Sequence, residues 1–155
     1  METTLIITIG VQCSGKSTWA KQYAKDNPEF IYLSTDEIWL KIGPMQDRSI
    51  AKQVYSILEI ECINALMNNK SVILDATFIK KSWRKKYINI GKVHADKVIA
   101  QVFIASRKEL LKRLENRVKN GGLNVPVEVI DKYINMFESP DNTESFDQIT
   151  LNLNG

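Results

Sequence analysis

The stretch Gly10-Val11-Gln12-Cys13-Ser14-Gly15-Lys16-Ser17 decides the fold of this chain. It satisfies the pattern GxxxxGK[ST], which chance would place in a chain of this length about once in a hundred times or less. The apolar run Leu5–Ile9 comes directly before it, and residues 16–25 follow with apolar side chains at helical spacing. A strand, this loop and a helix in that order form the geometry that binds phosphate groups. The pattern therefore predicts a site for a nucleoside triphosphate.

The residues of this loop have separate expected roles. Backbone N–H groups of the loop and of the helix start would converge on the β-phosphate, where the positive end of the helix dipole favours an anion. Lys16 would bridge the β- and γ-phosphates of ATP, and the Ser17 hydroxyl would bind Mg²⁺. The predicted nucleotide contacts in this segment are Gly10, Cys13, Ser14, Gly15, Lys16, Ser17 and Thr18.

Two aspartates follow expected strands, so both lie at the carboxyl edge of the sheet, where open α/β proteins bind ligands. Asp36 comes after the run 30–33 and is placed to accept the proton of a hydroxyl that attacks the γ-phosphorus. The alternative is that Asp36 caps or charges the first turn of the next helix, and position alone does not separate the two. Asp75, after the run 71–74, would hold Mg²⁺ through a water, unless it is a turn residue.

Two arginines point to a lid over the donor. Arg113 and Arg117 are four residues apart and share one helix face, and a glycine-containing stretch follows them. A lid-like segment of about 107–125 would place a guanidinium on the transferring phosphoryl group. The alternative is a solvated basic helix.

Strands and helices alternate along the whole chain. This order predicts one three-layer α/β domain over residues 1–155, a P-loop kinase fold with a mainly parallel five-stranded sheet and helices on both faces. The expected strands are 5–9, 30–33, 71–74, 98–104 and 148–153, the last one half exposed. The expected helices are 16–25, 34–41, 50–68, 82–90, 106–119 and 126–137.

Composition excludes several classes of protein. With 155 residues, 44% hydrophobic and 25% charged, the chain resembles an ordinary globular domain. No apolar run approaches the ~18 residues of a membrane span. Cys13 and Cys62 show no disulfide or metal-binding spacing, so we expect a cytoplasmic protein in a reducing environment.

Charge is distributed unevenly. The net charge of +3 is too small to indicate a nucleic-acid partner. Residues 80–92 carry basic and no acidic side chains, 107–119 are mostly basic, and 138–147 are acidic only. The two basic segments either attract polyanions or phosphate, or are solvated helix faces.

Several segments together resemble the kinase domain of the T-even phage polynucleotide kinases. The likeness begins with 7–10, 14–20 and 27–30, continues through Asp36-Glu37, Asp75-Ala76-Thr77 and the Arg113/Arg117 pair, and includes 125–130. The resemblance implies ATP-dependent phosphorylation of 5′-hydroxyl ends of RNA or DNA, with an adenylate-kinase-like sheet whose first strand is central. It also implies Lys16 and Ser17 on phosphates and metal, Asp36 as general base and Arg117 on the donor phosphate. A phage-encoded chain would act in the host cytoplasm.

The sequence departs from that family on the acceptor side. Trp39 stands where the family has an arginine that contacts the acceptor phosphate, and Phe78 stands where the family often has an asparagine. The predicted acceptor contacts are Trp39, Thr77 and Arg84. Trp39 and Phe78 would also make a more apolar pocket, which favours the alternative of a kinase for a nucleoside, sugar or antibiotic. A nucleotide switch is a further alternative, and the lack of an Asp-x-Asp-x-Thr sequence predicts no 3′-phosphatase activity.

Overall fold

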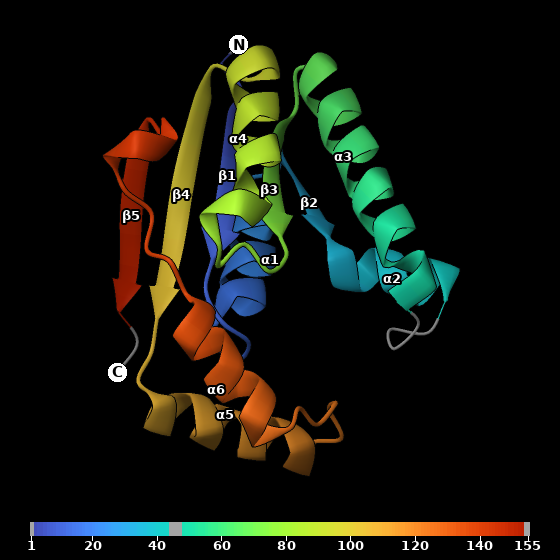
Figure 1. The fold of residues 1–155 in the computed structure, drawn as a ribbon. Helices are drawn as coiled ribbons and strands as arrows, with labels where there is room; N and C mark the ends of the chain where they lie inside the picture. Colours follow the sequence, from blue (N-terminus) through green and yellow to red (C-terminus); the bar gives the residue numbers. More distant parts are fainter. Residues whose placement is uncertain (1, 44–47, 154–155) are drawn as a thin grey trace.

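A parallel sheet of five strands, in the order β2-β3-β1-β4-β5, forms the centre of the computed structural model, which describes residues 2–43 and 48–153 (Figure 1). Every neighbouring pair of these strands is parallel, and the first strand is central. The predicted α/β fold and its adenylate-kinase-like strand order are therefore confirmed. The strands are β1 Thr4–Ile9, β2 Phe30–Ser34, β3 Ser71–Asp75, β4 Lys97–Ile104 and β5 Gln148–Leu153.

Helices cover both faces of the sheet and its lower end. α3 and α4 pack on one face and α1 on the other, while α5 and α6 lie across the end at which the strands point (Figure 1). The α-helices are α1 Lys16–Asp26, α2 Thr35–Ile42, α3 Ala51–Met67, α4 Lys81–His94, α5 Arg107–Lys119 and α6 Val127–Met136. Short 3₁₀ turns, η1 Arg48–Ile50 and η2 Asn142–Glu144, complete the order. In the described ranges, no helix combines the length and apolar character needed to cross a membrane.

The central strand β1 is buried on both faces. Leu5, Ile7 and Ile9 belong to the hydrophobic core under α3 and α4, whereas Ile6 packs with Ala20 on the α1 side. Side chains alternate between the two faces of a strand, and a strand covered on both sides is continuously apolar. This burial fixes the position of the loop that follows β1.

Helix α4 is longer than the sequence predicted. The expected helix 82–90 stops before Gly91, but α4 continues to His94. A Cβ atom at Gly91 would lie 2.5 Å from Val98 Cγ2 and 2.8 Å from Leu5 Cδ2. The glycine therefore allows α4 to pack closely on the sheet and does not end the helix.

The edge strand β5 has the predicted bounds, but its side chains are more exposed than its alternating apolar and polar residues predicted. Ile149 packs against the main core, whereas Leu151 and Leu153 are 54% and 71% exposed. These two leucines are therefore exposed on the edge strand of the sheet.

Candidate active site

The loop between β1 and α1 adopts a backbone that only certain residues allow. Cys13 and Gly15 both have positive φ angles, 66° and 99°. Turns of this kind direct successive N–H groups into a concavity that binds anions. Gly10 is required by space: a Cβ atom there would lie 2.6 Å from Ser14 Oγ and 2.9 Å from the carbonyl oxygen of Phe103. The loop has the geometry that the sequence pattern predicts for phosphate binding.

Two polar side chains of the loop, Ser14 and Lys16, are buried. The Lys16 ammonium donates a hydrogen bond to the carbonyl oxygen of Gly10 at 2.7 Å. Burial lowers the pKa of Lys16, and the carboxylates of Asp75 and Asp36 act in the opposite direction. Within the described residues, Ser14 Oγ is buried and has no hydrogen-bond partner. A buried polar atom without a partner is costly, so this hydroxyl is suited to a ligand.

Ser17, Asp75 and Tyr32 meet at the edge of the sheet beside the loop. Asp75 Oδ2 accepts hydrogen bonds from Ser17 Oγ at 2.6 Å and from the Tyr32 hydroxyl at 2.5 Å. Hydroxyl and carboxylate oxygens are the ligands that Mg²⁺ prefers, together with phosphate and water. The described residues contain no cluster of three or more His, Cys, Asp or Glu that would hold a metal by themselves. The Ser17–Asp75 pair therefore fits Mg²⁺ bound jointly with a nucleotide.

Asp36 lies in the first turn of α2 but does not cap it. The cap is Ser34, whose hydroxyl oxygen accepts a hydrogen bond from the N–H of Glu37 at 3.3 Å. Although Asp36 is exposed on α2, the surrounding protein partly desolvates its carboxylate and so raises its pKa, and the charge of Asp75 raises it further. The positive charges of Lys16, Arg117 and Lys21 oppose this shift, in that order. A carboxylate whose pKa is raised toward neutrality is a better proton acceptor.

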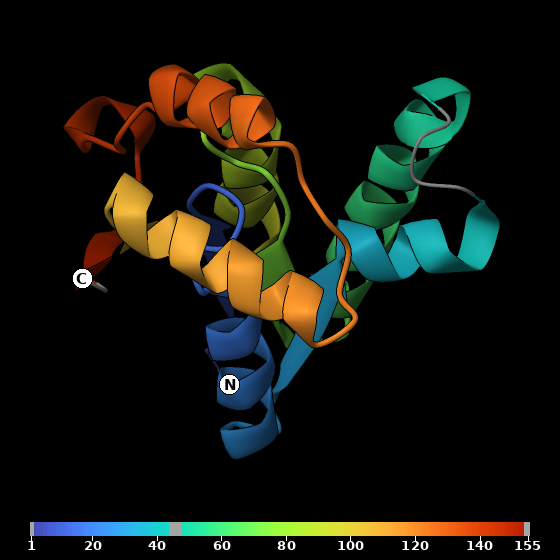
Figure 2. The same cartoon turned by 90° about the horizontal axis from the view of Figure 1, so that it is seen from below.

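The lid-like segment is anchored to the phosphate loop. Leu110 and Leu114 of α5 are buried in a cluster that also contains Val11 of the loop. Arg113 Nη1 donates a hydrogen bond to the carbonyl oxygen of Cys13 at 3.2 Å. Figure 2, seen from the carboxyl ends of the strands, shows α5 passing next to the loop. Arg117, near the end of α5, is exposed and its charge acts on Asp36.

The prediction that Arg84 contacts the acceptor is wrong. Its side chain is fully buried, and it donates hydrogen bonds to both carboxylate oxygens of Glu144 and to the carbonyl oxygen of Phe78. Trp39 is partly buried against the main core, and Thr77 is half-buried. Phe78 is only 1% exposed, so it lines no acceptor pocket.

The basic segment 80–92 pairs with the acidic segment 138–147. Besides the Arg84–Glu144 pair, Lys81 contacts Asp141 at 2.5 Å and Lys92 contacts Asp147 at 3.1 Å. Much of the positive field expected from the first segment is therefore neutralised within the fold.

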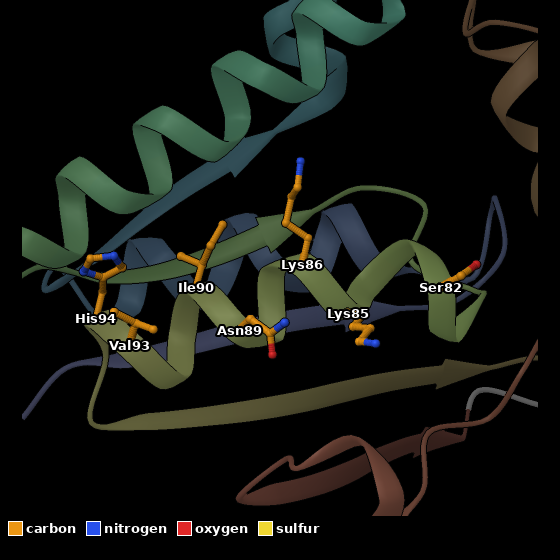
Figure 3. A pocket seen from close by; sticks show the side chains of 7 residues that line it. All are labelled: Ser82, Lys85, Lys86, Asn89, Ile90, Val93 and His94. Atoms are coloured by element: carbon orange, nitrogen blue, oxygen red, sulfur yellow. The ribbon is translucent and has the colours of Figure 1, made fainter.

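An open hollow of about 560 Å³ runs along α4, away from the phosphate loop (Figure 3). All of the residues that line the hollow belong to α4. The side chains of Lys85 and Lys86 point to opposite sides of this helix. None of the predicted nucleotide or acceptor residues lines this hollow. The candidate site is therefore the sheet edge and not this surface.

Sequence reasoning missed three residues near Asp36 and Asp75. Tyr32 bonds to Asp75, and the Lys21 ammonium lies 5.9 Å from the centre of the Tyr32 ring. Tyr55 on α3 is 37% exposed, and its pKa is raised by burial, then by Tyr133 and Asp36. These contacts join residues far apart in the chain, so no local spacing announces them.

Two curated relatives are longer than this chain. The L-seryl-tRNA(Sec) kinase of Methanococcus maripaludis is 31% identical over 147 residues, covering 92% of this chain and 56% of the relative. Heterogeneous nuclear ribonucleoprotein U-like protein 2 of Mus musculus is 24% identical over 161 residues, covering 96% and 21%. The chain thus spans about a fifth of the second relative and just over half of the first.

Three solved structures share the fold. The Pnkp1/Rnl/Hen1 RNA repair complex matches with a TM-score of 0.79 and 24% identity, over 87% of this chain and 44% of the other. A fungal RNA kinase matches with a TM-score of 0.63 and 20% identity, over 97% and 74%. A gluconokinase from Sinorhizobium meliloti matches with a TM-score of 0.65 and 14% identity, over 98% and 82%.

The family to which this chain can be assigned is broader than the phage polynucleotide kinases that its sequence resembles. A family model described as AAA domain matches residues 5–140, which include the loop, both aspartates and α5. The chain therefore belongs to the AAA domain family, and it has the P-loop kinase fold.

Proposed function

We propose that this P-loop kinase transfers the γ-phosphate of ATP to 5′-hydroxyl ends of RNA or DNA. The observation that carries the proposal is the carboxylate of Asp36. It lies at the carboxyl edge of the sheet and leaves the helix cap to Ser34, and the charges of Lys16 and Arg117 act on it. A polynucleotide acceptor is supported by the resemblance to phage polynucleotide kinases and by relatives whose names specify a tRNA kinase and an RNA kinase.

Each group has one role in the proposed transfer. The loop N–H groups and Lys16 bind the phosphates of ATP, and Arg117 of the lid-like segment contacts the γ-phosphate. Ser17 and Asp75 would hold Mg²⁺, which neutralises phosphate charge when bound. Asp36 takes the proton from the acceptor hydroxyl as its oxygen attacks the γ-phosphorus in line.

An acceptor panel tests the proposal directly. With labelled ATP, we expect label on the 5′ end of a 5′-hydroxyl oligonucleotide and little on nucleosides, gluconate or other small alcohols. Oligonucleotide binding neutralises phosphates and releases counterions, so the KM for this acceptor should rise steeply with salt. Label found only on a small alcohol, with a KM that salt does not change, would contradict the polynucleotide acceptor.

A small-molecule kinase is the second candidate, favoured by the fold shared with a gluconokinase. Its sequence argument required Trp39 and Phe78 to line an apolar acceptor pocket. Phe78 is buried against Tyr87, with ring centres 5.2 Å apart, so it makes no contact with an acceptor. Of the two residues, only Trp39 still supports this alternative, and the same acceptor panel distinguishes it from the polynucleotide kinase.

The pH dependence of acceptor turnover should report the environment of Asp36. Asp36 must be ionised to accept a proton, and its pKa is raised above the ordinary value of 3.8. At saturating ATP, kcat/KM for the acceptor should therefore fall as pH decreases through this raised pKa. The Lys21 charge lowers the pKa of Asp36, so Lys21→Met should move the acid limb to higher pH.

A matched variant controls this shift. Lys25→Met changes a lysine one turn further along α1 and should leave the acid limb in place. An identical limb in the Lys21→Met variant and the wild type would show that the titrating group is not Asp36.

A further inference from the structure

Asp75 is held by two hydroxyl groups from different elements of the fold. Asp75 ends β3 and is only 6% exposed, Ser17 lies in the first turn of α1, and Tyr32 lies on the neighbouring strand β2. Both hydroxyls donate to the same carboxylate oxygen, Oδ2, at 2.6 Å and 2.5 Å. The Ser17 bond follows from the phosphate-loop fold. The Tyr32 bond, in contrast, requires a side chain with a hydroxyl group at this position of β2.

Tyr32 is fixed as a donor. An ionised carboxylate only accepts hydrogen bonds, so the phenol must supply the proton. Its ring packs beside Ala20 and Ile73, with the Lys21 ammonium 5.9 Å from the ring centre.

We propose that Tyr32 is a positioning residue that holds the Asp75 carboxylate in place for the Mg²⁺ of bound ATP. In the present structure Asp75 Oδ2 accepts hydrogen bonds from both Ser17 Oγ and the Tyr32 hydroxyl. If Ser17 Oγ were to bind the metal instead of Asp75, the Tyr32 hydrogen bond would still hold the carboxylate beside the loop. Hydrogen bonds to a ligating carboxylate fix its orientation, and their loss weakens metal affinity. This inference rests on the nucleotide-binding part of the proposed function and not on the acceptor.

Tyr32→Phe tests the inference because it removes only the hydroxyl. ATP binding is measured by calorimetry across a Mg²⁺ titration and again in excess chelator. We expect the Mg²⁺ concentration for half-maximal strengthening of ATP binding to rise roughly 10- to 100-fold. ATP affinity without metal should stay at the wild-type value, which a general loss of structure would not permit.

Tyr87→Phe is the matched control. Its hydroxyl also donates a hydrogen bond, at 3.4 Å to the carbonyl oxygen of Tyr55, but it lies on α4 and away from Asp75. This variant should keep the wild-type Mg²⁺ dependence. An unchanged Mg²⁺ dependence in Tyr32→Phe overturns the inference, and so does an equal loss of ATP affinity with and without metal.

Failure of this inference is distinguishable from failure of the proposed function. A Tyr32→Phe protein with the wild-type Mg²⁺ requirement that still labels RNA ends overturns only the role of Tyr32. A wild-type protein that labels only small alcohols overturns the polynucleotide acceptor, while the Mg²⁺ titration still decides the role of Tyr32. Wild-type ATP binding that ignores Mg²⁺ overturns the inference directly.

Discussion

Replacing Asp36 with asparagine is expected to lower kcat for phosphoryl transfer by roughly 10²- to 10⁴-fold, the contribution typical of a positioned general base. Asparagine keeps the size and hydrogen-bonding capacity of aspartate but cannot take a proton from the acceptor hydroxyl. The dissociation constant of ATP should change little, because Lys16 and the loop N–H groups remain. Single-turnover transfer from labelled ATP measures the first quantity, and calorimetry measures the second.

Glu37→Gln is the control for this substitution. Glu37 is the next residue on α2, is exposed, and gives only its backbone N–H to the Ser34 cap. Its variant should keep the wild-type rate. If Asp36→Asn keeps most of the rate as well, Asp36 serves only as an acidic residue in the first turn, where it stabilises α2 by about 0.3–1 kcal/mol.

The phosphate loop was predictable because its geometry is encoded locally. Spacing alone identifies Gly10, Gly15 and Lys16, and the apolar strand before them fixes where the loop lies. The Ser17–Asp75 contact was also within reach of sequence reasoning. Parallel strands end at one edge of the sheet, so an acid at the end of β3 comes close to the loop after β1.

Tyr32 was not predictable in the same way. Its partner Asp75 is 43 residues away, and the contact requires β2 to lie next to β3. In the sequence, the run 30–33 reads only as an apolar strand, and nothing in its spacing separates a packing tyrosine from a hydrogen-bond donor. Strand order must be known before the side chains at that edge can be paired.

Arg84 was assigned incorrectly because charge was counted along the chain. The run 80–92 contains no acid, yet Glu144 lies 60 residues later and pairs with Arg84 inside the fold. A local count of charge detects neighbours on one helix but not partners brought together by tertiary structure. The acidic segment 138–147 was visible in the sequence, and pairing the two segments was the missing step.

Arg84→Met is expected to lower the free energy of unfolding by about 3–5 kcal/mol, the usual cost of leaving one member of a buried ion pair alone. Arg84 is 0% exposed and Glu144 is 8% exposed, with the Nε–Oε1 distance at 2.6 Å. The substitution also removes the donor to the carbonyl oxygen of Phe78. Native domains have a total stability of about 5–15 kcal/mol, so the loss should be plain in urea unfolding.

Two further variants decide what Arg84 does. Lys86→Met removes a cation from the same helix whose pair with Glu59 is exposed, so it should cost only about 0–1 kcal/mol. Adding Glu144→Leu to Arg84→Met removes the uncompensated charge and should restore part of the lost stability. An Arg84→Met protein that unfolds at the wild-type urea concentration but has a raised KM for the oligonucleotide would return Arg84 to the acceptor site. The buried pair with Glu144 argues for the opposite result, a destabilised protein whose remaining folded fraction binds acceptor normally.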